Sequence, residues 1–278
     1  ETTHMTRQFT IFYKMVEAYG TYGSKYYKDK VLRRDILYGF DWLYNNLYGQ
    51  AEIEGRGWRD TSLYNWWDWY CGSAKPLVNA LLIMEDDLTP EKIKTYLSLY
   101  DHLRTQMRTA NTPDNAASRV YAGTAAAALE EDFKRMHSMV DDYNLMMMPV
   151  ESGNGIQEDG LYITHGYFAY STAYGTSSLL DRLVAVEAIL AGTAFEFATP
   201  YKYNSCEWLY ETFEPLIFNG AMTNAQTGRS KGSEQSYTAY AVAAMIDFIG
   251  AFGKDDDYRL KQAIKRSVTE DNKNVIYN

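Results

Sequence analysis

The stretch TPEKIKTYLSLYDHLRTQM, residues 89–107, begins with the pair Thr89-Pro90, which is typical of the first turn of an α-helix. Upstream, residues 8–19 place apolar side chains three to four positions apart, a spacing that also indicates a helix. Long period-two runs of valine or isoleucine are missing, so we expect few strands and no β-hairpin. The sequence predicts one all-α domain of helical hairpins over residues 1–278. Further helices are predicted at residues 30–48, 74–84, 115–136, 178–197, 204–218, 234–250 and 255–268.

The composition limits the classes of function. Hydrophobic residues make up 46% of the 278 residues, which is typical of a globular chain. The net charge of -9 disfavours nucleic acid as a partner, and no run of lysine and arginine is present. No apolar run approaches the ~20 residues that span a bilayer. The 25 tyrosines and 6 tryptophans either build an aromatic core or line a carbohydrate groove, and composition leaves both interpretations open.

Signatures of metal and cofactor sites are missing. The four histidines are not paired with each other or with cysteine at a ligand spacing, so we expect no metal and no cofactor. No nucleophile elbow, phosphate-binding loop or dinucleotide fingerprint occurs. The two cysteines, Cys71 and Cys206, are either free thiols or one disulfide. Loop carboxylates such as Asp68, Glu158 and Asp159 keep glycoside hydrolysis by a carboxylate pair open.

The unusual residues fall in the predicted loops. GIQEDGLYITHGYFAYSTAYG, residues 155–175, holds one histidine, four tyrosines and four glycines with little apolar periodicity. A second loop contains Asn65-Trp66-Trp67, whose adjacent indoles point to different faces, so one of them can form an exposed platform. The other two features are Asn115 in TPDNAASR and Arg229 in TGRSKGSEQ. Because loops on a helical scaffold often carry function, these are the candidate site residues.

Together the four features resemble polysaccharide lyase family 8, which includes chondroitin AC, hyaluronate and xanthan lyases. In that family a tyrosine follows the catalytic histidine by nine positions, the separation of His165 and Tyr174 here. The family's aromatic patch begins with Asn-Trp-Trp, and its catalytic asparagine lies about fifty residues before the histidine, where Asn115 stands. A downstream Gly-Arg pair is matched by Gly228-Arg229. The resemblance covers residues 65–233.

The resemblance implies a fold, a location and a set of site residues. It implies an incomplete (α/α) toroid that is the N-terminal catalytic domain of a larger, secreted or periplasmic lyase, whose β-sandwich domains are not in this chain. An acidic polysaccharide is the implied partner, with no metal, membrane or nucleic acid. The implied catalytic residues are Asn115, His165, Tyr174 and Arg229, and the implied substrate-binding residues are Asn65, Trp66, Trp67, Arg119 and Lys231.

Lyases of this family cleave the bond at C4 of a uronic acid by β-elimination. Removing the C5 proton adds charge to a carboxylate that is already negative, so donors such as Asn115 and His165 must first neutralise it. A phenol ionises near pH ~10, and a nearby cation such as Arg229 favours the phenolate. Tyr174 is therefore the preferred base, and it then passes its proton to the leaving oxygen, although the sequence leaves His165 open as the base.

One departure from the family keeps other functions open. Family members often carry a second arginine four residues after the first, where this chain has Ser233, with Lys231 nearby. A glycan-binding domain without catalysis therefore stays an alternative, as does a glycoside hydrolase on a similar helical toroid. No recognisable motif indicates which polymer is the substrate or whether cutting is endo or exo. The sequence also does not indicate whether this chain is active alone.

Overall fold

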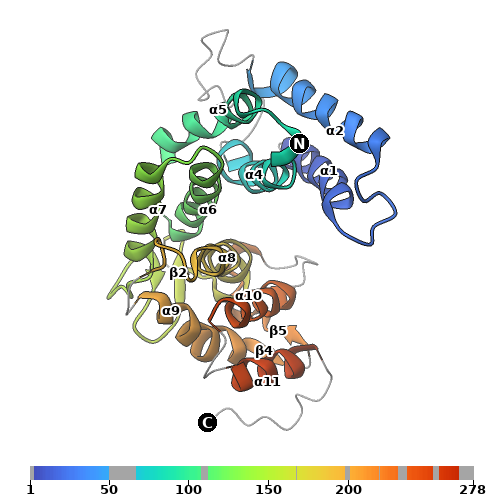
Figure 1. Ribbon diagram of the computed structural model, residues 1–278. Helices are drawn as coiled ribbons and strands as arrows, with labels where there is room; N and C mark the ends of the chain where they lie inside the picture. Colours follow the sequence, from blue (N-terminus) through green and yellow to red (C-terminus); the bar gives the residue numbers. More distant parts are fainter. Residues whose placement is uncertain are drawn as a thin grey trace. The chain divides into compact units, whose positions relative to one another are not determined.

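The computed structural model describes the backbone of residues 3–49, 67–107, 112–166, 168–197, 201–218, 220–230, 237–252 and 257–268 (Figure 1). Helices dominate these segments, as expected. The backbone divides into two compact units, of which unit 1 comprises Glu1–Thr109 and Ala122–Met136. Unit 2 comprises Ala110–Tyr121 and His137–Asn278. That residues 1–278 act as one catalytic domain stays a prediction.

The helices of unit 1 agree with the apolar pattern of the sequence. Its elements are α1 (Thr3–Gly20), α2 (Lys30–Leu43), η1 (Tyr44–Tyr48), η2 (Asp68–Gly72), α4 (Ala74–Ile83), η3 (Glu85–Asp87) and α5 (Pro90–Met107). The helix predicted at residues 30–48 continues from α2 into the wider winding of η1. Helix α1 packs against both α2 and α4, so the apolar stripes of three helices meet.

Aromatic side chains form much of the core of unit 1. The Phe40 ring makes an edge contact with Phe12 at 4.8 Å between centroids and stacks on Tyr96 at 5.0 Å. The buried hydroxyl of Tyr48 donates to the backbone oxygen of Tyr96 at 3.1 Å, which satisfies its polar end. Part of the high tyrosine content therefore serves packing, one of the two interpretations that composition left open.

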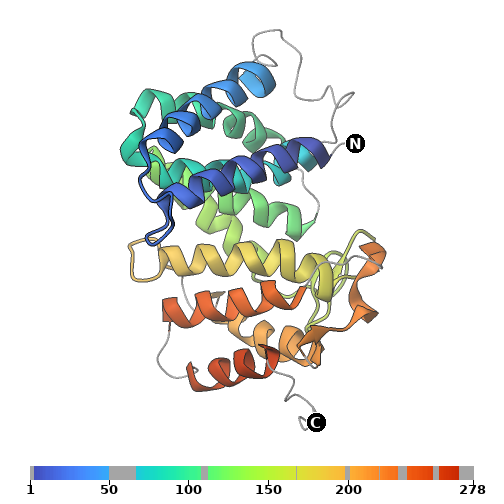
Figure 2. The ribbon, with the colours of Figure 1, turned by 90° about the vertical axis from the view of Figure 1, so that its right-hand side faces the viewer.

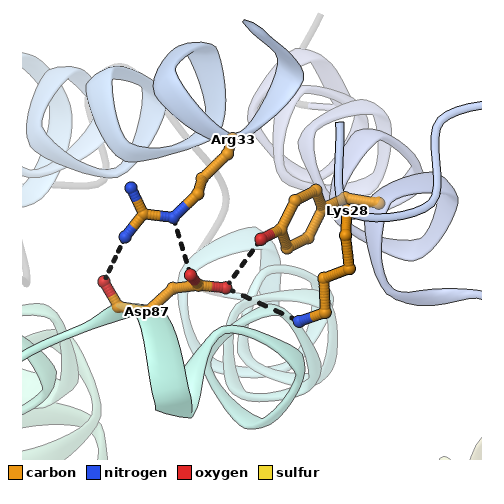
Figure 3. A network of polar contacts seen from close by, with 4 residues as sticks. Lys28, Arg33 and Asp87 are labelled. Atoms are coloured by element: carbon orange, nitrogen blue, oxygen red, sulfur yellow. Dashed lines mark hydrogen bonds and ion pairs between the residues drawn. The ribbon is translucent and has the colours of Figure 1, made fainter. Parts of the chain in front are cut away.

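Asp87 joins three elements of unit 1 at one carboxylate (Figure 3). Arg33 Nε donates to Asp87 Oδ1 at 2.6 Å, while the Tyr19 hydroxyl donates to Oδ2 at 3.0 Å. Lys28 Nζ lies 3.7 Å from the same Oδ2. Although desolvation raises the pKa of Asp87, the hydrogen bonds from Arg33 and Tyr19 outweigh it, and the pKa is lowered. The ionised form is therefore favoured in the folded state, where it links α1, α2 and η3.

Unit 2 is built around three neighbouring helical segments. Helix α10 (Tyr237–Phe252) packs against η4 (Ser171–Leu180) and α8 (Asp181–Leu190), and its other side meets α11 (Asp257–Val268) (Figure 2). Elements η4 and α8 follow each other directly, so they form the yellow helix of Figure 2. The remaining helical elements of this part of the chain are α9 (Tyr201–Trp208), η5 (Leu209–Phe213), η6 (Glu214–Leu216), η7 (Asn224–Gln226) and η8 (Gly228–Ser230).

Two small antiparallel sheets in unit 2 correct the expectation of no hairpin. One sheet has the order β1-β2-β3, formed by Gly155–Ile156, Tyr162–Thr164 and Phe168–Ala169. The other pairs β4 (Ile217–Phe218) with β5 (Ala221–Met222), and the sequence between these strands reads Asn-Gly. Strands of two or three residues are too short to show a period of two. The Asn-Gly dipeptide, however, is a typical hairpin turn and was a readable signal.

The alanine-rich helix predicted at residues 115–136 is also wrong in its extent. The structure has two helices there, α6 (Pro113–Leu129) and α7 (Phe133–Met146). Glu131 adopts a left-handed φ of 53°, and the Asp132 N–H bonds back to Ala127 at 2.9 Å, which closes α6. The Asp132 carboxylate then accepts from the Arg135 N–H at 2.9 Å and caps α7. A glutamate at the position usually taken by glycine hid this break.

Other boundaries shift for local reasons. The helix predicted at residues 178–197 begins earlier, within η4, and ends at Leu190, where Gly192 has a φ of 73°. Cys71 and Cys206 are both buried and do not form a disulfide. No helix among the described residues combines the length and hydrophobicity that a bilayer-spanning segment needs.

Glu187 on α8 is a fully buried carboxyl group in unit 2. Its Oε2 accepts from the Ser205 hydroxyl at 2.5 Å, and its Oε1 accepts from the hydroxyl of Tyr143, whose ring stacks on Phe197. Desolvation raises the pKa of Glu187 to about 8, although both hydroxyl donors favour the ionised form. The neutral carboxyl therefore predominates in the folded protein at neutral pH.

We expect this group to make the folded state less stable as pH rises. The unfolded carboxyl ionises near pH 4.5, so between pH 4.5 and about 8 the folded state holds one more proton than the unfolded state. The contribution of Glu187 to the free energy of unfolding is therefore complete below pH 4.5, decreases as pH rises from 4.5 to about 8, and is lost above that pH. Glu187→Gln keeps the shape of the side chain but cannot ionise, so the free energy of unfolding of this variant should change less with pH. Urea unfolding at several pH values between 5 and 9 would measure the free energy of unfolding of both proteins. The same pH dependence in both proteins would contradict the raised pKa of Glu187.

Candidate active site

His165 lies in the turn that joins β2 to β3, where Thr164 pairs with Phe168 across the ladder. Its backbone has a φ of 54°, a left-handed conformation that non-glycine residues rarely adopt. Strain of this kind persists only where the surroundings hold the residue, and it gathers at functional sites. The imidazole is half-buried, and its Nδ1 lies 3.2 Å from the Thr164 Oγ1.

Tyr174 stands beside His165 and is stacked on a second tyrosine. The rings of Tyr170 and Tyr174 lie 4.6 Å apart with an interplanar angle of 3°. The His165 ring is 5.4 Å from the Tyr174 ring and 5.7 Å from the Tyr170 ring. Residues four apart lie on one face at the start of η4, where the Gly175 N–H bonds to the Tyr170 oxygen at 3.0 Å. Such wide helical turns are frequent at functional sites.

Arg229 reaches the same tyrosine from a distant part of the chain. The interaction of its guanidinium with the Tyr174 side chain raises the pKa of Arg229 more than burial lowers it. The Arg229 backbone N–H donates to the Tyr170 hydroxyl at 3.0 Å. A cation and a phenol are therefore neighbours in unit 2, and the phenol ring lies 5.4 Å from the His165 ring.

Gly228 makes the approach of Arg229 possible. Its φ of 53° is left-handed, and a Cβ added there would lie within 2.5 Å of three atoms of the Tyr170 ring. Because Tyr170 is fully buried and held between Tyr174 and Gly228, its ring has little room to move. Glycine is therefore required at position 228 because any larger residue would collide with the Tyr170 ring, and the sequence alone does not show this contact.

Asn115 occupies the first turn of α6, next to a buried carboxylate that binds β2. Its Nδ2 donates to the Thr112 Oγ1 at 2.7 Å, and only 6% of the residue is exposed. The neighbouring Asp114 accepts from the Tyr162 hydroxyl at 2.7 Å and from the Thr164 hydroxyl at 3.1 Å. These bonds tie the start of α6 to β2, the strand that leads into His165.

The predicted substrate-binding residues fall in different places. Trp67 precedes η2 in unit 1 and is 36% exposed. Arg119 on α6 is buried and forms an ion pair with Asp142, so its guanidinium is engaged within the protein. Their binding roles stay predictions. Asn65, Trp66 and Lys231, which carry the remaining predictions, lie outside the described residues.

Several residues of the cluster were missed by sequence reasoning. Tyr170 was inside the quoted stretch, and its spacing of four from Tyr174 was the available signal. Asp114, Tyr162 and Thr164 gave no signal beyond their nearness to Asn115 and His165. Among the residues that the structure describes, no group of three or more His, Cys, Asp or Glu side chains could hold a metal ion.

Comparison with known proteins identifies the family of the chain. Residues 1–266 match the family described as polysaccharide lyase family 8, N terminal alpha-helical domain. A xanthan lyase of Bacillus sp. (strain GL1) is 28% identical over 268 residues, which cover 95% of this chain and 28% of that protein. The hyaluronate lyase HylB of Enterococcus faecalis (strain ATCC 700802 / V583) is 29% identical over 270 residues, covering 88% of this chain and 26% of that protein.

A solved structure supports the fold. The chondroitin AC lyase of Streptomyces coelicolor A3 aligns with a TM-score of 0.78 at 22% identity, over 92% of this chain and 35% of that one. The all-α fold class expected from the sequence is confirmed. The chain spans about a quarter to a third of the length of these three proteins. By its match over residues 1–266, the chain belongs to polysaccharide lyase family 8, as part of the helical N-terminal domain.

Proposed function

We propose that this chain carries the catalytic residues of a lyase that cleaves a uronic-acid-containing polysaccharide by β-elimination. The observation that carries the proposal is a cluster in which the Tyr174 ring lies 5.4 Å from the His165 ring and the Tyr174 side chain raises the pKa of Arg229. A phenol that acts as a base needs a fixed positive charge to stabilise its phenolate, and Arg229 supplies one. The overall charge of -9 repels a polyanion, so a local cation also favours productive binding.

The proposed reaction proceeds without a covalent intermediate. Asn115 and His165 donate hydrogen bonds to the uronate carboxylate, which lowers the energy of the charge that develops when the C5 proton leaves. The Tyr174 phenolate takes that proton. The C5 electron pair forms the C4=C5 double bond as the C4–O bond breaks, and Tyr174 returns its proton to the leaving oxygen. Each step uses a side chain of this chain, so we expect chelators to leave activity unchanged.

The substrate class rests on what the relatives are called. They are named xanthan, hyaluronate and chondroitin AC lyases, and we propose a polymer of the same acidic kind for this chain. Because the chain matches only part of each relative, we also propose that it works within a longer protein that contains β-sandwich domains. Long polysaccharides do not cross a bilayer, so we propose a secreted or periplasmic location.

The carboxylates that would serve a hydrolase have local partners or stand in solvent. Asp68 is buried in unit 1 and accepts from the Thr6 hydroxyl at 2.6 Å. Asp159 is exposed and accepts from the Leu161 N–H at 3.1 Å within a turn, and Glu158 is exposed beside it. These positions favour the phenol-based mechanism over a carboxylate pair.

The test is ultraviolet absorbance during incubation with hyaluronan, chondroitin sulfate and xanthan, with reducing ends counted in the same samples. Elimination makes a double bond conjugated to the carboxylate, so we expect one new chromophore per new reducing end on at least one polymer. The same polymer with its carboxyl groups reduced to alcohols is the matched control and should resist cleavage, because the C5 proton is then no longer acidified.

The other outcomes separate the alternatives. Reducing ends without the chromophore would identify a hydrolase, and binding without either product would identify a glycan-binding domain. The same panel with a longer protein that contains this chain decides whether further domains are needed. If that protein also gives no chromophore on any polymer, the proposed function is wrong.

A further inference from the structure

The hydrogen on the His165 ring decides what this residue can do. A neutral imidazole carries hydrogen on either Nδ1 or Nε2, and the other nitrogen is then an acceptor. Among the residues that the structure describes, the hydrogen-bonding contact of this ring joins Nδ1 to the Thr164 Oγ1 at 3.2 Å, and it permits either direction of donation. The direction follows from the other contacts of Thr164.

The Thr164 hydroxyl has one hydrogen, and three neighbouring groups could accept it. They are the Asp114 Oδ1 at 3.1 Å, the His165 Nδ1 and the Tyr162 hydroxyl. An ionised carboxylate only accepts, and it is a stronger acceptor than a neutral ring nitrogen. The hydrogen therefore points to Asp114, and Thr164 offers its lone pair to His165.

Tyr162 supports the assignment of Asp114 as an acceptor. Its hydroxyl accepts from the Asp114 backbone N–H at 3.2 Å, so its own hydrogen is directed to the Asp114 Oδ1 at 2.7 Å. Burial, together with the nearby Asp114 charge, raises the pKa of Tyr162 well above its usual value, and the phenol stays a donor. Both hydroxyl groups therefore donate to the same oxygen, and Asp114 Oδ1 acts as the acceptor of the cluster.

We propose that Asp114 and Thr164 form a relay that keeps hydrogen on the Nδ1 of His165, which leaves Nε2 as the nitrogen that gains and loses a proton. All members lie in unit 2, and Asp114 and Thr164 are buried. Among the described residues, the other titratable or charged groups that face this ring or its relay include the phenols of Tyr162, Tyr170 and Tyr174 and the Arg229 guanidinium. A buried carboxylate fixes a histidine tautomer in the same way in serine proteases. The catalytic part of this inference rests on the proposed function.

The consequence concerns how His165 serves the elimination. With Nδ1 committed to Thr164, the ring donates to a substrate carboxylate only through a protonated Nε2. The Nδ1 bond to Thr164, backed by Asp114, holds the ring in the orientation from which Nε2 meets the substrate. Asp114 and Thr164 are thus positioning residues that act through His165.

The first test is spectroscopic and needs no substrate. Selective ¹⁵N labelling of the four histidines, with His165→Gln to assign the signal, distinguishes the two neutral tautomers by their nitrogen shifts. We expect hydrogen on Nδ1 in the wild-type chain. A neutral His165 with hydrogen on Nε2 would overturn the proposal, whether or not the chain cleaves any polymer.

Variants test the relay itself. Thr164→Val keeps the shape but removes the acceptor, and Thr164→Ser keeps the hydroxyl. Asp114→Leu removes the carboxylate that accepts the Thr164 hydrogen, so the hydroxyl can donate to Nδ1. We expect the tautomer to move to Nε2–H in the valine and leucine variants and to stay on Nδ1 in the serine variant. An unchanged tautomer in the valine and leucine variants would overturn the relay. If these variants do not fold, the wild-type spectrum decides alone.

Kinetics test the catalytic part. On a polymer that the wild-type protein cleaves, we expect Thr164→Val to lower kcat by about 100-fold with little change in KM, and Thr164→Ser to recover most of it. Wild-type kcat in Thr164→Val would refute a catalytic role for the relay. If the wild-type protein cleaves no uronate polymer, the proposed function fails, while the tautomer measurement still confirms or refutes the relay.

Discussion

Replacing Tyr174 with phenylalanine is expected to lower the rate of elimination by about 10³-fold, since general acid–base catalysis commonly contributes 10²–10⁴-fold. The variant loses the one hydroxyl that is proposed both to take the C5 proton and to protonate the leaving oxygen. The ring itself remains, so its stacking on Tyr170 at 4.6 Å should persist. Polymer binding should therefore survive the substitution, while kcat falls.

The measurement combines the chromophore assay with a binding titration of the same polymer. Tyr170→Phe is the matched control, because it keeps a stacked ring and removes only the hydroxyl that accepts from the Arg229 N–H. We expect a loss of about 10-fold or less there, in line with one neutral hydrogen bond. Full activity in Tyr174→Phe would exclude this tyrosine as the base and direct attention to His165.

Replacing Gly228 with alanine is expected to disrupt the site from a distance. The new Cβ would lie within 2.5 Å of the Tyr170 ring, which is fully buried and stacked on Tyr174. Either the ring moves, and Tyr174 with it, or the Arg229 backbone withdraws. A displacement of about 1 Å in a catalytic constellation can cost 100-fold in rate, and overpacking typically costs about 1–3 kcal/mol of stability.

Gly153→Ala separates the steric effect from backbone strain. Gly153 has a φ of 88°, also in the left-handed region, but nothing lies within 4 Å of its hypothetical Cβ. We expect this control to lose about 1–2 kcal/mol from the conformational term alone and to retain activity. Thermal unfolding and the chromophore assay measure both variants. Equal losses of stability with equal activity would contradict the steric argument for Gly228.

Local sequence patterns predicted most of the helices, and the family resemblance named His165, Tyr174 and Arg229, which are neighbours in the structure. The first turn at Thr89-Pro90 and the apolar spacing of residues 8–19 correspond to α5 and α1, because these signals depend on neighbours within one or two turns. The break between α6 and α7 and the β4–β5 hairpin were missed for different reasons. The break places glutamate where glycine is usual, whereas the hairpin carries a typical Asn-Gly sequence between strands too short to show a period of two.

By itself, the sequence determined the all-α class, the family and the spacing of nine between His165 and Tyr174, because each is carried by residue identity at short separation. Only the tertiary structure decided that Thr164 donates to Asp114 across 50 residues and that Arg229 approaches Tyr170 across 59. Contacts at such separations leave no periodicity in the chain, since they depend on how β2, α6 and η8 pack. For the same physical reason, the direction of one hydroxyl hydrogen, and with it the proposed tautomer of His165, follows from the fold.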